Sequence, residues 1–385
     1  MQTGKQSVTF SSSVYITHAA SVVGSKEGQG PLGKQFDLVV KDDMLNQNSW
    51  EEAESAFQKK AVDIVMDKAN TNPTQIDLLL AGDLLGQSIA SSFGTADFPV
   101  PHIGLYGACS TCGLTLLNAA SWVSGGHAKK VICVTSSHFA SAEKEFRFPL
   151  AYGNQRPESS TWTVTGSGAF LLSDKPDEIA KSSFNKCNSI EQTSSSSDNK
   201  CNSNKQAPAS SPEEISRNSA LKHENSVKNV RILAATIGKI VDYGIKDSMN
   251  MGACMAPAAA STIAANLQDL EVSPHAYDKI ITGDLGTVGQ TLLYDLLWKK
   301  HIDIQNIHMD CGVQIYDKIK QGTHAGGSGC GCSAVTLAAM ILPKLVSGEW
   351  KKVLFVPTGA LLSKTSFNEG MTIPGIAHGV VLEGE

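Results

Sequence analysis

Two stretches of the chain show the same succession of apolar and polar positions. In each, a helical pattern precedes a short apolar run, a glycine-rich turn leads into an apolar helix, and a further apolar run follows. The predicted helices and strands cover residues 51–68, 77–80, 112–122 and 131–135 in the first stretch, and 256–270, 279–282, 332–345 and 353–356 in the second. Strands that are apolar throughout and alternate with helices indicate parallel sheets covered on both faces.

Short sequence blocks also recur in the same order in both stretches. Pro73, Asp77 and Gly82-Asp83-Leu84 return as Pro274, Asp278 and Gly283-Asp284-Leu285. Cys-Ser at 109–110, Ser-Gly at 124–125 and Lys-Lys-Val at 129–131 return at 332–333, 347–348 and 351–353. The spacing is far too long for a solenoid. The chain therefore predicts an α/β fold of two similar halves, stacked as an α/β/α/β/α arrangement of five layers, with a site where the halves meet.

Composition places a third segment between these halves. Residues 176–228 contain 13 Ser and 7 Asn and almost no aromatic residue. Such a segment cannot bury enough apolar surface to offset its ordering entropy. We expect an N-terminal half at 1–175, a flexible insertion at 176–228 and a C-terminal half at 229–385. The insertion can be a solvated linker or can carry a motif for a partner.

Charge and cysteine content exclude several classes of protein. A net charge of −5 over 385 residues gives no basic footprint, so no nucleic-acid partner is expected. The chain lacks a run of 18 apolar residues and a signal-peptide core, which predicts neither a spanning helix nor secretion. Nine scattered cysteines favour reduced thiols in a cytosol-like compartment. Cys109 and Cys112 with Cys330 and Cys332 could bind zinc, but both pairs open apolar helices, and we expect no metal site.

Cys109 is the first candidate for chemistry. It stands in Gly107-Ala-Cys-Ser-Thr111, a turn of small residues at the start of an apolar helix. Helix N-terminal amides stabilise a thiolate there, and small neighbours admit a ligand. The alternative is that Cys109 is a small buried core residue.

Duplicated α/β halves with Gly-Ala-Cys-Ser before a central helix resemble the thiolase superfamily, which includes condensing enzymes of the ketoacyl synthase III type. The resemblance covers residues 1–175 and 229–385 and implies that Cys109 takes the place of the acyl-accepting nucleophile. The strand end where that superfamily carries a histidine reads Ile281-Thr-Gly-Asp284, and an ionised aspartate would repel an enolate. His324 is the one imidazole in the second catalytic region. The resemblance therefore implies a thiolase fold that has lost condensing chemistry.

A longer motif gives a closer resemblance. Thr-Ser-Ser-His-Phe-Ala-Ser-Ala-Glu-Lys-Glu-Phe-Arg-Phe-Pro-Leu at 135–150, Tyr-Gly-Asn-Gln-Arg at 152–156, Thr-Trp-Thr-Val-Thr-Gly at 161–166 and Gly-Asp-Leu-Leu-Gly-Gln at 82–87 resemble the stage V sporulation protein AD family of spore-forming bacteria. This implies a non-catalytic protein that binds pyridine-2,6-dicarboxylate (dipicolinic acid), alone or as its calcium chelate, for uptake into the developing spore. Implied partners are membrane proteins of the same operon, which would hold the chain at the spore inner membrane. The thiolase likeness implies a homodimer.

A flat aromatic dianion needs guanidinium or amide donors for its carboxylates and an apolar wall for its ring. The candidate ligand residues are Cys109, His138, Arg147, Tyr152, Asn154, Gln155, Arg156, Trp162, Asp83, Asp284 and His324. Structural alternatives stand beside these assignments. Arg147 and Arg156 can pair with nearby glutamates, and His138 can be a satisfied core residue. Asp83 and Asp284 can cap helices, pair with a basic residue or hold Ca²⁺.

Two other functions remain open from the sequence. The first is an acyl-CoA-dependent condensing or acyl-transfer enzyme, with Cys109 as nucleophile and His324 as its partner. The second is a structural subunit that recruits membrane components through its surface.

Overall fold

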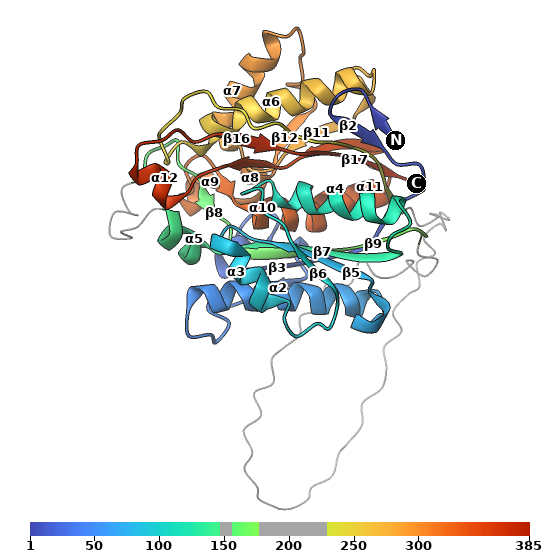
Figure 1. Cartoon of the computed structure of the whole chain (residues 1–385). Helices are drawn as coiled ribbons and strands as arrows, with labels where there is room; N and C mark the ends of the chain where they lie inside the picture. Colours follow the sequence, from blue (N-terminus) through green and yellow to red (C-terminus); the bar gives the residue numbers. More distant parts are fainter. Residues whose placement is uncertain (147–155, 177–228) are drawn as a thin grey trace, which may run out of the picture.

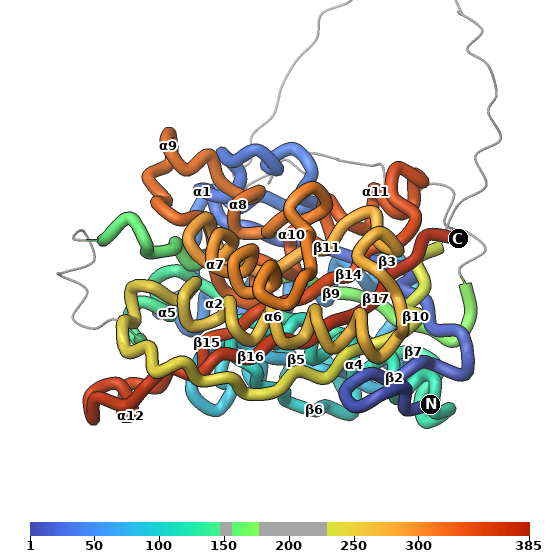
Figure 2. Tube along the Cα trace, turned by 90° about the horizontal axis from the view of Figure 1, so that it is seen from above, coloured from blue at the N-terminus to red at the C-terminus, as the bar shows by residue number. Residues whose placement is uncertain are grey.

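The computed structural model describes residues 1–146, 156–176 and 229–385. Figure 1 shows five stacked layers: one helical layer lies between two sheets, and a further helical layer covers the outer face of each sheet. The predicted α/β/α/β/α fold is therefore confirmed. The expected insertion at 176–228 lies almost wholly outside the described residues, and its boundaries stay a prediction. Both chain termini lie at one end of the molecule, opposite α12 (Lys364–Asn368) (Figure 2).

The two sheets have the same strand succession. The first runs β3 (Tyr15–Val23), β9 (Gly166–Ser173), β7 (Lys130–Ser137), β5 (Leu78–Gly82) and β6 (His102–Gly104). The second runs β10 (Val230–Thr236), β17 (Gly379–Gly384), β14 (Lys352–Val356), β11 (Lys279–Thr282) and β12 (His308–Asp310). They join where β3 pairs antiparallel with β10 through Tyr15–Arg231 and Ile16–Val230. The two halves are thus related as the sequence repeat suggested.

The expectation of parallel sheets is wrong in one respect. β9 is antiparallel to both of its neighbours, β3 and β7, and β17 is antiparallel to β10 and β14. The β7–β5–β6 and β14–β11–β12 portions are parallel, and so is the short pairing of β4 (Leu38–Val39) with β3. β9 and β17 are nevertheless buried on both faces, because helices cover each sheet on both sides. Their apolar runs therefore carry no sign of strand direction.

The repeated aspartates have the same structural task in both halves. Asp77 precedes β5, and its Oδ2 accepts hydrogen bonds from the backbone amides of Lys129 and Lys130 at 2.7 and 3.0 Å. Asp278 precedes β11 and accepts from the amides of Lys351 and Lys352 at 2.7 and 2.9 Å. Through these hydrogen bonds, each carboxylate links the start of one parallel strand to the start of its neighbour. This explains why Asp and Lys-Lys-Val recur together.

Helices fill the three helical layers. The central layer contains α4 (Thr111–Ser124), α10 (Cys330–Thr336), the π-helical turn Leu337–Ile341 and α11 (Leu342–Val346). The outer layers contain α2 (Trp50–Lys68) and α3 (Ile89–Gly94) on one side, and α6 (Met251–Asp269) and α7 (Gly286–Trp298) on the other. The expected helices at 51–68, 112–122, 256–270 and 332–345 correspond to α2, α4, α6 and the α10–α11 run.

The repeated Cys-Ser pair occupies different places in the two central helices. α4 begins at Thr111, after Cys109, whereas α10 begins at Cys330, before Cys332. The pair therefore lies in the turn before the helix in the first half and inside the helix in the second. At the other end, Gly348 of the second Ser-Gly block has a left-handed backbone, whereas in the first half Gly126 does, one residue after the Ser-Gly block.

Short elements complete the fold. The remaining strands are β1 (Gln2–Thr3), β2 (Ser7–Thr9), β4 (Leu38–Val39), β8 (Trp162–Thr163), β13 (Gly327–Ser328), β15 (Thr358–Ala360) and β16 (Gly375–Ala377). The remaining helices are α1 (Ser25–Gly28), α5 (Phe139–Phe146), α8 (Cys311–Ile315) and α9 (Lys318–Gln321), with 3₁₀ turns at Gly33–Gln35, Pro73–Gln75, Gly86–Ser88 and Pro274–Ala276. None of the helices described here is both long and apolar enough to cross a bilayer.

Candidate functional site

Cys109 stands in a tightly held turn between β6 and α4. Ala108 before it has a left-handed backbone, with φ of 49°. The amides of Ser110 and Thr111 donate to the carbonyls of Gly107 and Ala108, each at 3.1 Å. The Thr111 hydroxyl accepts from the Gly107 amide at 3.0 Å and donates to the Ala108 carbonyl. A non-glycine residue with positive φ persists only where its surroundings hold it, so this turn fixes where the cysteine points.

The second half closes directly over this turn. A Cβ at Gly359, in β15, would lie 2.6 Å from the Gly107 carbonyl oxygen and 3.1 Å from the Cys109 amide nitrogen. A glycine is therefore required for the two backbones to approach this closely. β8 of the first half also pairs with β13 of the second, Thr163 opposite Ser328. The cysteine consequently lies where the two halves meet.

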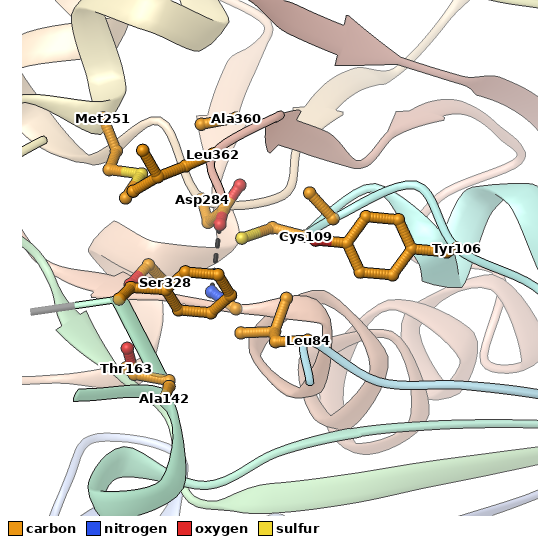
Figure 3. Close-up of a pocket in the computed structure, with 13 residues that line it drawn as sticks. Leu84, Tyr106, Cys109, Ala142, Thr163, Met251, Asp284, Ser328, Ala360 and Leu362 are labelled. Carbon is orange, nitrogen blue, oxygen red and sulfur yellow. Dashed lines mark hydrogen bonds between the residues drawn. The ribbon is translucent and has the colours of Figure 1, made fainter. Parts of the chain in front are cut away.

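A small cavity lies beside the thiol. Its volume is about 30 Å³, which is room for one or two water molecules. The lining is mostly apolar and comes from both halves: Leu84, Tyr106, Ala108, Cys109, Ala142, Phe146, Thr163, Met251, Asp284, Ser328, Gly329, Ala360 and Leu362. Figure 3 shows Cys109 and Asp284 facing each other across it.

A larger pocket of about 380 Å³ lies against the cavity. The two share four lining residues, Leu84, Tyr106, Phe146 and Leu362. The larger pocket is also lined by Leu85, Gly86, Gln87, Ser88, Glu145, Leu361, Ser363 and Ser366. Its volume is in the range of small-molecule sites. We name it the outer pocket and the smaller space the inner cavity. No lysine, arginine or histidine is among the described residues that line either one.

Asp284 is the acidic group of the inner cavity. Its Oδ1 accepts from the Thr358 hydroxyl at 2.6 Å, and its Oδ2 accepts from the Gly329 amide at 3.0 Å. Burial raises the pKa of Asp284 to about 7, against the lowering effect of these two hydrogen bonds and of one from the Cys109 thiol. The negative charge of Asp310 raises it further. Near neutral pH, Asp284 therefore exists in both protonation states.

The other three cysteines of the two sequence pairs considered for zinc are sealed in the core. Cys112, Cys330 and Cys332 have no exposed surface, and burial raises the pKa of each thiol. The Cys330 thiol donates to the Ser136 carbonyl at 2.8 Å. Among the residues the structure describes, no group of three metal-ligating side chains is present. Cys109 is the cysteine of this group that reaches the cavity.

His138 lies away from the inner cavity and the outer pocket. Its Nε2 is 3.0 Å from the Asp43 carbonyl oxygen, and its Nδ1 accepts from the Ala140 amide at 3.2 Å. Burial lowers the pKa of His138, so the neutral ring with a proton on Nε2 fits both contacts. Its proposed contact with a ligand remains a prediction, and the described partners are those of a satisfied core histidine.

Arg156 lies over the ring of Trp162, which itself stacks on Phe139. The Trp162 ring lies face to face with Phe139, with centroids 4.0 Å apart, and the Arg156 guanidinium lies 4.8 Å from the Trp162 centroid. Arg156 also donates to the Thr161 carbonyl and lies 3.9 Å from Glu143. These are contacts within the protein, and neither Arg156 nor Trp162 lines the cavity, although Thr163 next to Trp162 does.

Asp83 and His324 have protein partners outside the cavity. The Asp83 carboxylate accepts from the Leu85 amide at 2.8 Å and from the Ser91 amide and hydroxyl at 2.7 and 2.6 Å. It thus caps the turn into α3 and holds Leu84 and Leu85 in the pocket wall. His324 lies 3.3 Å from the exposed Glu158 through Nδ1. The structure therefore does not bring His324 to Cys109.

Four predicted ligand residues, Arg147, Tyr152, Asn154 and Gln155, lie outside the described residues. Several lining residues were not predicted, among them Tyr106, Phe146, Met251, Ala360 and Leu362. Apolar side chains at a pocket wall look in sequence like any core residue. Two of them could have been found from their positions in the sequence, since Phe146 lies within the long motif and Tyr106 lies three residues before Cys109.

The fold and the sequence both have known relatives. Chains of similar structure include 3-oxoacyl-[acyl-carrier-protein] synthase III from Aquifex aeolicus VF5 (TM-score 0.50, 13% identity, 96% of this chain and 99% of that one). A single-residue variant of OleA from Xanthomonas campestris (0.51, 13%, 97% and 99%) and the acyltransferase ChlB3 (0.52, 11%, 96% and 97%) are also similar. Identities this low establish a thiolase-like fold alone.

Sequence similarity is more specific. The model of the family described as stage V sporulation protein AD matches residues 4–383. Stage V sporulation protein AD of Bacillus subtilis (strain 168) is 38% identical over 381 residues, which cover 99% of this chain and 97% of that protein. With Cys109 at a junction between two thiolase-like halves and the long 135–166 motif in place, the chain belongs to the stage V sporulation protein AD family.

Proposed function

We propose that this protein binds dipicolinate at the outer pocket and inner cavity and serves its uptake into the developing spore without catalysing a reaction. The observation that carries the proposal is the site itself. A mostly apolar pocket of about 380 Å³ leads to a cavity with a thiol and a carboxyl group, and no imidazole lines it among the described residues. An apolar wall with a few polar groups at its end suits a flat ring that carries carboxylates.

Family membership supports the same proposal. The chain is a member of a sporulation protein family with a thiolase-like fold. In the proposed complex the aromatic ring lies between Leu84, Phe146 and Leu362, and one carboxylate reaches the inner cavity. The cation for the other carboxylate is the sequence-predicted Arg147, which lies outside the described residues. The ligand can be dipicolinate or its calcium chelate. Titration with dipicolinate in the presence and in the absence of calcium distinguishes the two.

Isothermal titration of the purified chain with dipicolinate tests the proposal, with acetyl-CoA as the comparison ligand. Saturable binding of dipicolinate alone is expected. Binding of acetyl-CoA alone would overturn the proposal. Cys109→Ala is expected to retain dipicolinate binding within about threefold, because the thiol contributes to the wall of the cavity and to no covalent step. Cys112→Ala, in the sealed core, is the matched control for loss of a thiol.

The second candidate is an acyl-transfer enzyme with Cys109 as nucleophile. The accessible thiol and the likeness to condensing enzymes favour it. Against it, His324 lies at Glu158, and Asp284 occupies the cavity. Incubation with acyl-CoA of several chain lengths should leave the intact mass of the protein unchanged. A mass increase by one acyl group that Cys109→Ala abolishes would establish the enzyme instead.

We also propose a homodimer and association with membrane proteins of the same operon at the spore inner membrane. β6 is the last strand on its side of the first-half sheet, and His102 and Gly104 on it are exposed. Such an edge offers unpaired backbone groups to a second copy. Light scattering on a size-exclusion column should give the mass of two chains. His102→Pro, which removes a backbone amide that points away from β5, should give the mass of one.

A further inference from the structure

We propose that Asp284 is the proton-accepting residue of the ligand site, so that binding of the dianion takes up one proton and Asp284 in its neutral form donates a hydrogen bond to the ligand carboxylate. The inference rests on the proposed function, because it assumes that dipicolinate occupies the site. It adds a role for one residue and a dependence of binding on pH.

The geometry puts the carboxyl group where the anion would arrive. Asp284 lines the inner cavity, faces Cys109 (Figure 3) and is 1% exposed. Its described partners are hydroxyl, amide and thiol donors, and no cation is among them. A second negative charge beside a buried, uncompensated carboxylate is strongly unfavourable. Two carboxyl groups at close range therefore share a proton, and the proton removes the repulsion.

Among the described residues that line the inner cavity, Asp284 is the one carboxyl group, and other titratable groups surround it. Burial raises the pKa of Cys330 and Cys332 on α10 and of Tyr106 before α4 well above neutrality. The charge of Asp310, on β12, raises the pKa of Asp284. Burial raises the pKa of Asp310 as well, against the lowering effect of hydrogen bonds from the amides of Leu285 and Gly286 at 2.9 and 3.0 Å, but Asp310 lines neither the inner cavity nor the outer pocket. Cys109 shares a hydrogen bond with Asp284.

Three further acids lie near the pocket. Glu145 lines the outer pocket, and Asp83 and Glu54 lie behind the wall. Asp83 is saturated by Leu85 and Ser91, and Glu54 accepts from the hydroxyls of Ser136 and Ser141 at 2.9 and 2.6 Å. Neither Asp83 nor Glu54 lines the inner cavity. Because Glu54 also has its pKa raised by burial, to about 8, it provides the matched control.

Asp284→Asn tests the role of the proton. The amide has nearly the same shape, its oxygen can accept from the Gly329 amide, and its NH₂ can donate to the Thr358 hydroxyl and to a ligand carboxylate. The variant thus imitates neutral Asp284 and cannot titrate. Glu54→Gln removes a buried carboxyl group of similar pKa outside the cavity.

The experiment is calorimetric titration with dipicolinate in buffers of different ionisation enthalpy, which counts protons taken up on binding. The wild type should take up about one proton at about pH 8, and its Kd should rise roughly tenfold per pH unit above about pH 7. Asp284→Asn should bind with no proton uptake and a flat pH profile, whereas Glu54→Gln should behave as the wild type.

Several outcomes would overturn the inference. Binding to the wild type without proton uptake would do so while leaving the proposed function in place, as would proton uptake that persists in Asp284→Asn. Absence of dipicolinate binding at every pH would overturn both. If Asp284→Asn does not fold, infrared difference spectra of the wild type decide. A protonated-carboxyl C=O band that grows on adding ligand supports the inference, and its absence contradicts it.

Discussion

Residues 107–111 and Gly359 show how single positions define the site. The left-handed Ala108 and the Thr111 hydroxyl bonds fix the cysteine turn, and β15 reaches that turn only because residue 359 has no side chain. Sequence analysis found the turn, because small residues before an apolar helix are a local signal. It did not find Gly359, because the contact joins two segments about 250 residues apart.

Gly359→Ala should disturb the site strongly. The new Cβ would lie 2.6 Å from the Gly107 carbonyl oxygen and 2.9 Å from the Ser110 amide, so one backbone must move. We expect a loss of about 1–3 kcal/mol of unfolding free energy and a weaker affinity for dipicolinate. Gly104→Ala is the control, since its Cβ meets only the His102 ring at 3.7 Å. Equal stability and affinity of the two variants would contradict the close approach.

The protonation of Asp284 also lay beyond sequence reasoning. The sequence shows an aspartate at a strand end, and an ionised group was expected there. Complete burial raises its pKa to about 7, and burial depends on Thr358 and Gly329 from distant segments. For His138 and Arg156 the sequence predicted ligand contacts, but the structure shows contacts with the protein itself. The His138 ring contacts the Asp43 carbonyl, and the Arg156 guanidinium contacts Glu143 and the Thr161 carbonyl.

Neighbouring parallel strands in both halves are joined at their starts by the same carboxylate–amide hydrogen bonds. Asp77 and Asp278 each hold two amides at the start of the neighbouring parallel strand. Sequence periodicity located the strands β5, β7, β11 and β14 and the helices between them. It did not locate β9 and β17, which run antiparallel to their neighbours, and a strand buried on both faces has the same apolar pattern in either orientation.

Removing either aspartate should weaken its own half of the molecule by a similar amount. Asp77→Ala and Asp278→Ala should each lower the unfolding free energy by about 1 kcal/mol, since two amides lose a charged acceptor at an exposed strand end. Urea unfolding measures the change. Asp77→Asn should recover part of the loss, because its amide oxygen still accepts. A loss in one half without the other would show that the repeated contacts are not equivalent.

The described part of the molecule contains several buried acids whose hydrogen-bond donors are neutral, which makes its stability depend on pH. Burial raises the pKa of Glu54 to about 8 and that of Glu27 and Asp284 to about 7. An acid whose pKa is higher in the folded state binds more protons there than in the unfolded chain. These groups therefore stabilise the fold least above pH 8, and their contribution falls as pH rises from about 4.5 to 8.

Glu54→Gln should reduce this dependence. Urea unfolding of the wild type at pH 5, 6.5 and 8 should show a fall in unfolding free energy of several kcal/mol, and the variant should show a smaller fall. The exposed Glu369→Gln serves as control and should follow the wild type. A variant whose stability falls as steeply as that of the wild type would show that Glu54 is ionised in the folded protein.

The unequal helix starts in the central layer have a consequence for substitution at the two repeated cysteines. α10 begins before Cys332 and encloses it, whereas α4 begins after Cys109, which stays partly accessible. At 332 any small apolar residue of similar volume would serve, and at 109 the replacement must also suit whatever enters from outside.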